Sequence, residues 1–374
     1  MFPNQDFCQR FSFGRPMVMV QESITSDLPG EVNKKDPLIP LSLWLDQTSR
    51  IMKYRRFGRT EWQVSEVGYG MWGLAGWTNT DKAEVAVALD KAVELGCNFF
   101  DTAWAYGDGV SERILADLLK RHASKRLYAA TKVPPKDRNW PPVKGNSIRN
   151  VFPADYLREY TEKSLQNLDV DTIDLLQLHV WEDAWAGEDE WKSVVQRLKE
   201  EGKIRAFGLS LNRWEPENGM EAIRTGLVDA VQVIYNIFDQ NPEDELFPLC
   251  RNEDIGVIAR VPFDEGGLIG HLTKDTQFPE HDWRAGYFCE ENLIPTVQHA
   301  DALKPLVPSG SNLPEMALRF ILSNPDVATV IPGMRQVKHV DANIKSSALG
   351  PLDQGLINAL RPHRWVRKPT SWSM

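Results

Sequence analysis

The chain has 374 residues, of which 25% are charged and 42% hydrophobic, and a formal net charge of −9 at pH 7. This composition is typical of a globular protein, and the negative charge gives it no general reason to bind nucleic acid or an anionic membrane surface. Its four cysteines, Cys8, Cys97, Cys250 and Cys289, form no CxxC pair and favour a reducing, cytoplasmic setting. The sequence shows neither a secretory signal nor an apolar run near the ~20 residues that span a bilayer.

Residues 1–51 differ from the rest of the chain. They mix Pro, Gly and polar residues without a sustained hydrophobic period, which is typical of a poorly ordered tail. From Met52 onward the sequence predicts a short hairpin and then a compact domain over residues 52–374. We therefore expect a disordered extension over 1–51 and regard Met52 as a candidate native start. Mass spectrometry of the native N-terminus tests this hypothesis, since a peptide from residues 1–51 contradicts it.

Eight short runs rich in apolar and β-branched residues follow, each bounded by turn-forming residues. They cover residues 67–73, 99–103, 127–133, 174–180, 204–210, 231–236, 256–262 and 329–334. Between them lie segments with helical spacing of apolar residues, including 81–96, 111–122, 155–168 and 191–202. Strands that are apolar on both faces and alternate with helices predict a parallel sheet, and eight such units predict closure into a (β/α)8 TIM barrel. A doubly wound open sheet is the alternative, but the first strand is not followed by GxGxxG spacing.

Four titratable residues fall at predicted strand ends. Asp101 and Tyr106 lie at and just beyond the second strand, Lys132 lies in the third, and His179 lies in the fourth. Catalytic residues of TIM barrels sit at the carboxyl ends of the strands, so we expect these four side chains to meet at one face.

The chemistry of the four side chains is coherent. The ammonium group of Lys132 would favour the phenolate of Tyr106, and Asp101 would supply the counter-charge that a buried lysine needs. His179 would donate a hydrogen bond that orients a substrate oxygen. Each residue taken alone is also compatible with a structural role: Asp101 as a turn or cap residue, Tyr106 as a loop aromatic, Lys132 as a strand-end charge that reaches solvent, and His179 as a core histidine.

The stretch DTAWAYGDGVSE at residues 101–112 resembles the DTAxxYGxGxSE motif of the aldo-keto reductase superfamily, and the similarity extends over roughly residues 52–346. The matching residues are Asp101, Thr102, Ala103, Tyr106, Gly107, Gly109, Ser111 and Glu112. The resemblance implies a TIM barrel and the reversible reduction of an aldehyde or ketone by hydride from a nicotinamide cofactor. It also implies that Tyr106 is the general acid, that Lys132 and Asp101 tune it, and that His179 orients the substrate.

The resemblance further implies contacts with the nicotinamide. Ser210 and Asn212 are similar to the Ser-Asn pair that binds the carboxamide, although Leu211 separates them here. Gln232 is similar to their amide partner on the next strand.

The loop after Pro262 resembles the segment that folds over the pyrophosphate, where Gly266 and Gly267 permit close approach of the backbone. Many family members carry Tyr-Ser-Pro-Leu where this chain has RVPF at 260–263, and their tyrosine stacks on the nicotinamide ring. The planar guanidinium of Arg260 would stack in its place or would pair with Asp264 or Glu265.

The segment IPGMRQVKHVDANI resembles the segment that binds the adenosine 2′-phosphate and the adenine in members of the family. Gly333 stands where many members carry a lysine, and His339 stands in place of a later arginine. Arg335 remains to bind the phosphate, or else is a solvated side chain, and Asn343 matches the adenine contact. NADP(H) is thus favoured over NAD(H).

Three tryptophans, Trp72, Trp104 and Trp181, are candidates for an aromatic pocket that takes a small carbonyl compound or a sugar. Residues 134–153, rich in Pro, Asn and Lys, either shape specificity at the active face or form a disordered surface insertion. A non-catalytic redox sensor or regulatory subunit of the same fold is the main alternative function, and detectable turnover distinguishes the two. An isomerase or metal-dependent hydrolase is disfavoured, because no HxH pair or carboxylate cluster marks a metal site.

Overall fold

The computed structural model describes residues 52–75, 81–212, 215–279 and 282–370. The predicted disordered extension over residues 1–51 lies outside the described residues and stays a prediction.

The described chain begins with the predicted hairpin, in which β1 (Tyr54–Arg56) and β2 (Gln63–Ser65) pair antiparallel. A single 3-10 turn, η1 (Gly58–Thr60), lies between them. The ring of Phe57 stacks on Trp62 and lies 5.5 Å from the ring of Phe99, and the ring of Trp62 lies 4.9 Å from that of Tyr128. Because Phe99 and Tyr128 are the first residues of their strands, the hairpin closes the amino-terminal end of the barrel.

All eight predicted core strands are present and run parallel in chain order. They are β3 (Tyr69–Gly70), β4 (Phe99–Asp101), β5 (Tyr128–Val133), β6 (Ile173–Leu178), β7 (Ile204–Ser210), β8 (Ala230–Ile234), β9 (Gly256–Arg260) and β10 (Val327–Val330). Single bridges from Val67 to Val330 and from Gly70 to Gly333 join β10 back to β3. The sheet therefore forms a nearly closed TIM barrel, as the sequence predicts. The first strand is shorter than predicted because the chain turns into η2 (Trp72–Leu74).

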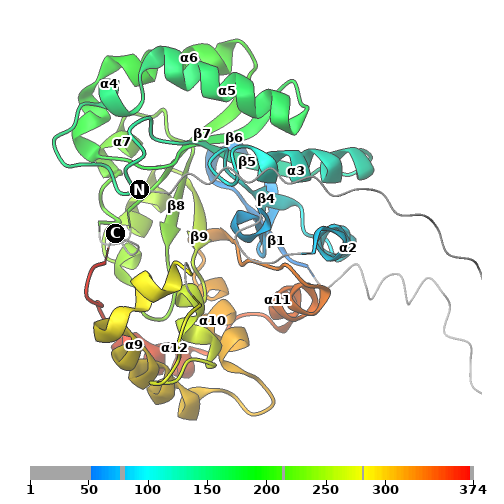
Figure 1. Ribbon diagram of the computed structural model, residues 1–374, viewed down its shortest axis with the longest axis vertical. Coiled ribbons are helices and arrows are strands. Elements are labelled where there is room, and N and C mark those ends of the chain that lie inside the picture. The colour runs from blue at the N-terminus through cyan, green and yellow to red at the C-terminus, as the bar shows by residue number, and fades with distance from the viewer. Residues whose placement is uncertain (1–51, 76–80, 213–214, 280–281, 371–374) are drawn as a thin grey trace, which may run out of the picture. The chain divides into compact units, whose positions relative to one another are not determined.

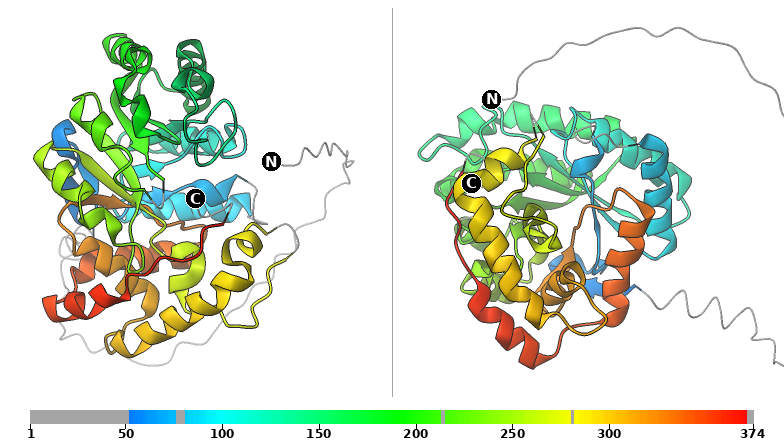
Figure 2. Two further views of the ribbon diagram at one scale, coloured as in Figure 1. Left: turned by 90° about the vertical axis from the view of Figure 1, so that its left-hand side faces the viewer. Right: turned by 60° about the horizontal axis from the view of Figure 1, so that its bottom comes forward.

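Helices surround the strands, as the views along and across the barrel show (Figures 1 and 2). The four helices predicted from the sequence are α2 (Lys82–Glu94), α3 (Val110–Arg121), α5 (Ala154–Leu168) and α6 (Asp189–Glu200). The others are α4 (Ile148–Val151), α7 (Met220–Arg224), α8 (Leu246–Asn252), α9 (Arg284–Leu303, with non-helical backbone at Cys289), α10 (Leu313–Leu322), α11 (Val337–Leu349) and α12 (Gln354–Leu360). The remaining 3-10 turns are η3 (Asp183–Gly187), η4 (Asn241–Glu243), η5 (Asp264–Ile269), η6 (Lys304–Leu306) and η7 (Arg361–His363).

The buried apolar residues form two clusters, one on each side of the barrel wall. The larger lies between strands and helices; α2, for example, contributes Val85, Leu89 and Ala92 at helical spacing. The smaller lies inside the barrel and includes Phe57, Phe99, Tyr128, Ala130, Leu175, Ala206, Ala230 and Ile258. The interior is therefore packed with side chains rather than open, and its apolar part lies toward the end closed by the hairpin.

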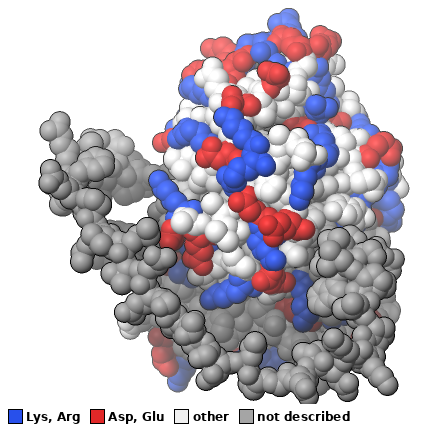
Figure 3. Space-filling view, turned by 90° about the vertical axis from the view of Figure 1, so that its right-hand side faces the viewer, with Lys and Arg blue, Asp and Glu red and all other residues white. Residues whose placement is uncertain are grey.

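Acidic and basic side chains are interspersed over the face drawn in Figure 3. No helix within the described ranges combines the length and hydropathy needed to cross a membrane.

Candidate active site

A polar layer lies above the apolar layer inside the barrel. Side chains two positions apart on a strand point to the same side, so the residue two after an interior apolar residue also faces inward. In five strands this residue is polar: Asp101 follows Phe99, Lys132 follows Ala130, Gln177 follows Leu175, Gln232 follows Ala230, and Arg260 follows Ile258. The strand pattern therefore collects polar side chains at the carboxyl end of the barrel.

Lys132 and Asp101 form a buried ion pair in this layer. The Nζ atom of Lys132 lies 2.7 Å from Oδ2 of Asp101 and 2.8 Å from the carbonyl oxygen of Thr102. Neither side chain is more than 4% exposed. A buried ammonium group needs a counter-charge, and the Asp101 carboxylate supplies it beside Tyr106.

Tyr106 lies next to this pair. Its hydroxyl oxygen is 3.4 Å from Nζ of Lys132, and Nζ also lies 5.2 Å from the centre of its ring. Burial raises the pKa of Tyr106 above its usual value, and the charge of Lys132 acts in the opposite direction. The effect of Lys132 is visible in the sequence, but in the folded protein desolvation is the larger cause, so the phenol is protonated at neutral pH.

His179 completes the predicted set, directly after β6. Its ring lies 5.6 Å from the ring of Tyr106, at an interplanar angle of 74°. Burial, followed by the charges of Lys132 and Arg260, holds the pKa of His179 well below its usual value. The imidazole is therefore neutral at neutral pH, and one of its nitrogens carries a proton that it can donate to a ligand. Its Nδ1 atom is buried and has no hydrogen-bond partner among the described residues.

The other motif residues have structural roles. Gly107 and Gly109 adopt φ values of +67° and +84°, which residues with a Cβ rarely reach, and they form the tight turn before α3. Ser111 accepts a hydrogen bond from Thr102, and the carboxylate of Glu112 accepts one from Thr131, next to Lys132. These bonds fasten α3 to β4 and β5 and so fix the segment that carries Tyr106.

Two of the predicted nicotinamide contacts lie side by side. Ser210 ends β7, Gln232 lies in β8, and the two are direct partners in the strand register. Both are buried, and Nε2 of Gln232 donates to Oδ1 of Asp101 at 2.7 Å. Asn212 lies beyond the strand, where its amide donates to the carbonyl oxygen of Trp181 at 3.4 Å.

The sequence reasoning missed Gln177. Its Nε2 atom lies 3.4 Å from Oδ1 of Asp101, so both Gln177 and Gln232 place an amide donor toward the oxygen that Lys132 does not hold. The available signal was its place two residues after Leu175, on the inward face of β6.

The loop after β9 has an unusual backbone. Arg260 is half-buried and donates to the carbonyl oxygen of Leu211 at 3.0 Å. Val261, Asp264 and Glu265 all have φ values between +50° and +56°, a region that is sterically costly for residues with a Cβ and rare for a β-branched one. Tertiary contacts hold the loop in this form: Asn236 donates to the carbonyl oxygen of Val261 at 3.0 Å.

A second contact fixes the same loop from the C-terminal segment. Asp264 and Arg367 form an ion pair in which both side chains are fully buried, and the hydroxyl of Tyr287 in α9 donates to Asp264. Lys368 and Asn292 exchange hydrogen bonds beside this pair. The last described residues thus fasten the loop after β9 to α9.

The predicted adenosine contacts lie around the start of α11. Arg335 is half-buried and packs beside Gly73, and Asn343 is buried in the helix. Gly333 is exposed, with open space where a side chain would point. Burial and the charges of Lys338 and Arg335 lower the pKa of His339, so at neutral pH the positive charge of this group comes from the lysine and the arginine.

Of the three predicted pocket tryptophans, Trp181 does not have the expected surroundings. It is fully buried, and its ring packs against those of Trp185 and Trp191. The strand ends at Leu178, so the inward alternation no longer applies at Trp181, whose ring belongs to the core.

Trp72 and Trp104 are half-buried. Trp104 packs edge-on against Tyr160 of α5 at 4.7 Å, and Trp72 packs edge-on against Trp283 at 5.3 Å. A fourth tryptophan, Trp140, contacts one of the predicted catalytic residues: its ring lies 5.7 Å from that of His179.

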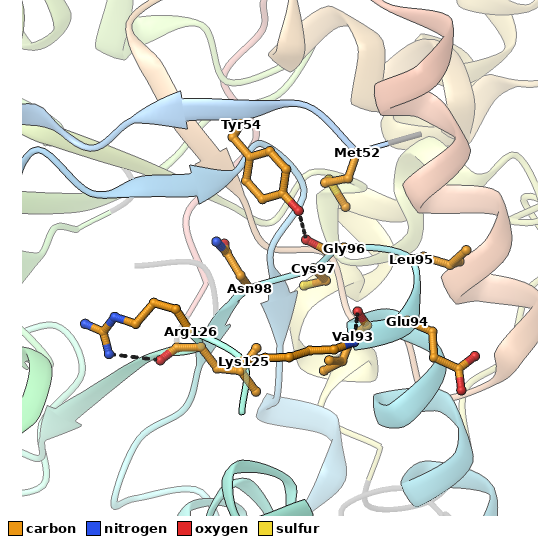
Figure 4. A pocket seen from close by; sticks show the side chains of 11 residues that line it. Met52, Tyr54, Val93, Glu94, Leu95, Gly96, Cys97, Asn98, Lys125 and Arg126 are labelled. Atoms are coloured by element: carbon orange, nitrogen blue, oxygen red, sulfur yellow. Dashed lines mark hydrogen bonds between the residues drawn. The ribbon is translucent and has the colours of Figure 1, made fainter. Parts of the chain in front are cut away.

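A cavity of about 320 Å³ lies elsewhere, at the amino ends of β4 and β5. Its lining includes Met52, Tyr54, Cys97, Asn98 and Arg126, and the Tyr54 hydroxyl donates across it to the carbonyl oxygen of Gly96 (Figure 4). None of the four predicted catalytic residues lines this cavity. It therefore lies at the opposite end of the strands from the candidate site.

Comparison with known proteins places this arrangement in a family. Residues 66–364 match the model described as the Aldo/keto reductase family. This chain belongs to that family. Its members are oxidoreductases that use nicotinamide cofactors and act on small carbonyl substrates.

The names of similar relatives describe different functions. The chain is 30% identical to the uncharacterized oxidoreductase YqkF of Bacillus subtilis, over 83% of this chain and 96% of that protein. It is 28% identical to the NADH-specific methylglyoxal reductase of Escherichia coli, over 78% and 93% of the two chains. It is also 27% identical to a probable voltage-gated potassium channel subunit beta of Arabidopsis thaliana, over 80% and 93%. A solved aldo-keto reductase, AKR11C1 from Bacillus halodurans in its holo form, is 29% identical with a TM-score of 0.67, over 84% of this chain and 97% of that one.

Proposed function

We propose that this family member catalyses the reversible, NAD(P)H-dependent reduction of an aldehyde or ketone to an alcohol, with Tyr106 as general acid. The observation that carries the proposal is the position of the buried Lys132 ammonium, 2.7 Å from the Asp101 carboxylate and 3.4 Å from the Tyr106 hydroxyl. A structural ion pair alone would not require a phenol beside it at the carboxyl end of the barrel.

The chain offers groups that fit a nicotinamide cofactor. Ser210 and Gln232, adjacent and buried, provide a hydroxyl and an amide, which complement the donor and acceptor of a carboxamide. Gly266 lies in the loop after β9 with open space within 4 Å of where a Cβ would be, so a ligand can approach its backbone. When bound, the cofactor supplies a hydride to the carbonyl carbon.

The chain's own residues would donate the proton in reduction and accept it in oxidation. The Tyr106 hydroxyl donates its proton to the carbonyl oxygen as negative charge develops there, and Lys132 stabilises the phenolate that remains. Asp101 holds Lys132 in place through their ion pair, and neutral His179 donates a hydrogen bond that orients the same oxygen. In the oxidation direction the phenolate of Tyr106 takes the proton back from the alcohol.

We propose that NADP(H) is preferred over NAD(H). The support is the pair of cations at the start of α11, Arg335 and Lys338, which suits a 2′-phosphate. One relative is an NADH-specific enzyme by name, and titration of this chain with both nucleotides measures its preference.

The proposed function is tested by fluorescence titration with NADPH and NADH, followed by NADPH oxidation with a panel of aldehydes, ketones and sugars. Wild-type protein should bind NADPH and oxidise it with at least one carbonyl compound. Tyr106→Phe should bind NADPH with unchanged affinity and lose turnover by about 10² to 10⁴. Undiminished turnover by Tyr106→Phe would contradict the role of the tyrosine.

A second candidate function is a cofactor-binding redox sensor or regulatory subunit. The similarity to a probable potassium channel subunit beta supports it. Tight NADPH binding with no turnover across the whole panel would favour this function over the reductase.

A further inference from the structure

We propose that Trp140 sets the substrate preference of this site, by presenting an aromatic surface beside His179 to the planar apolar group of an aryl aldehyde or aryl ketone. The inference rests on the proposed reductase function and names the class of substrate that the same site takes.

The position of Trp140 is the first observation. Residues 134–153 leave β5, the strand that carries Lys132, at its carboxyl end. The ring of Trp140 meets the His179 ring at 5.7 Å and 82°, and the ring of Tyr106 meets the same imidazole at 5.6 Å. An oxygen held by both Tyr106 and His179 therefore brings the substituents of its carbonyl carbon close to Trp140.

The frame that holds Trp140 is the second observation. Lys136 donates its backbone N–H to the carbonyl oxygen of Val151 at 2.9 Å and so closes the base of the segment. Within it, the Asn146 amide donates to Asp137 at 3.1 Å, and the Trp185 indole donates to the Asn146 carbonyl at 2.7 Å. These bonds tie the segment to the core, so the disordered insertion considered from the sequence is not what the structure shows.

The rings of two other tryptophans pack against aromatic side chains of the core or of a helix. Trp181 is enclosed by Trp185 and Trp191, and Trp104 packs against Tyr160 on α5. Trp140 is half-buried and in contact with a predicted catalytic ring, and the segment that carries it is tied to the core. A rigid aromatic surface pairs well with another planar ring and gains little from a short aliphatic or hydroxylated chain. The site should therefore favour aryl carbonyl compounds over small aliphatic ones.

The test compares benzaldehyde with propanal at saturating NADPH. For Trp140→Ala we expect kcat/KM for benzaldehyde to fall about ten-fold, mainly through KM, and kcat/KM for propanal to change by less than about two-fold. Trp140→Phe should keep most of the preference for benzaldehyde. Because phenylalanine fills more of the space than alanine, this variant also tests the role of the aromatic ring if the alanine variant folds poorly. Val143→Ala, at a 54% exposed residue of the same segment, is the matched control and should leave both values unchanged.

The outcomes separate this inference from the proposed function. Equal losses for both aldehydes in Trp140→Ala, or no loss for either, would overturn the role of Trp140 while the reductase function stands. A wild-type protein that oxidises NADPH with neither aldehyde, nor with any other carbonyl compound, would overturn both.

Discussion

Gln232 of β8 donates a hydrogen bond to the Asp101 carboxylate of β4, with 2.7 Å between Nε2 and Oδ1 across the interior of the barrel. Gln232 is also the residue proposed to meet the nicotinamide carboxamide. Its amide therefore joins the proposed cofactor site to the ion pair of Asp101 and Lys132 beside Tyr106. Gln177 reaches the same carboxylate oxygen at 3.4 Å from a position in β6.

The two glutamines should differ in their effects when replaced by leucine. Gln232→Leu should weaken nucleotide binding and lower kcat, each by about ten-fold, because it removes a polar contact to the cofactor and a donor to a charged carboxylate. Gln177→Leu should lower kcat with nucleotide affinity unchanged. Fluorescence titration and steady-state kinetics measure both quantities. Equal losses of affinity in the two variants would contradict this division of roles.

The pH dependence follows from the direction of two pKa shifts. Burial raises the pKa of Tyr106, and reduction uses the protonated phenol, so the reduction rate should be level through neutral pH and fall only at alkaline pH. Oxidation needs the phenolate and should rise over the same alkaline range. The pKa of His179 is well below its usual value, so its titration should not limit the rate near pH 6.5.

Lys132→Met tests the origin of the alkaline limit. The charge of Lys132 lowers the pKa of Tyr106, so removing it should move the alkaline limit of reduction to higher pH and slow oxidation. The measurement is the pH profile of kcat/KM in both directions. A limit that moves to lower pH would show that Lys132 does not stabilise the phenolate.

The buried pair of Arg367 and Asp264 should contribute to stability. Arg367→Met removes one partner of a fully buried ion pair with Asp264, and we expect a loss of about 3 to 5 kcal/mol in the free energy of unfolding. Urea unfolding measures it. The double variant Arg367→Met/Asp264→Leu should recover part of the loss, because the buried carboxylate is removed together with the guanidinium. A loss of less than about 1 kcal/mol in the single variant is the result typical of an exposed pair and would contradict the argument.

Arg335→Ala should change cofactor preference. If Arg335 binds the 2′-phosphate, its removal should weaken NADPH binding by about ten-fold and leave NADH binding unchanged. Lys345→Ala, at an exposed position further along α11, is the matched control for charge on the same helix. Equal loss of affinity for both nucleotides would show that Arg335 acts on something other than the phosphate.

The sequence was sufficient for the fold and for the strand ends that carry the candidate site. Alternating apolar runs and helical segments predict the barrel, because each element must bury its apolar face against the next. The predicted strand ends carry Asp101 and Lys132, and the parallel order of the strands brings these ends together, whereas Gln232 came from the family resemblance. The match at 101–112 supplied Tyr106, which lies beyond the strand.

Tertiary structure alone decided which of these groups touch. Local sequence patterns do not predict contacts between residues far apart in the chain. The pairing of Arg367 with Asp264 and the contact of Trp140 with His179 are of this kind, and so are the contacts that bury Trp181. The pKa of Tyr106 also depends on the tertiary structure. Lys132 is visible in the sequence, but the larger effect on this pKa is desolvation, because the surrounding chain buries the phenol only once it has folded.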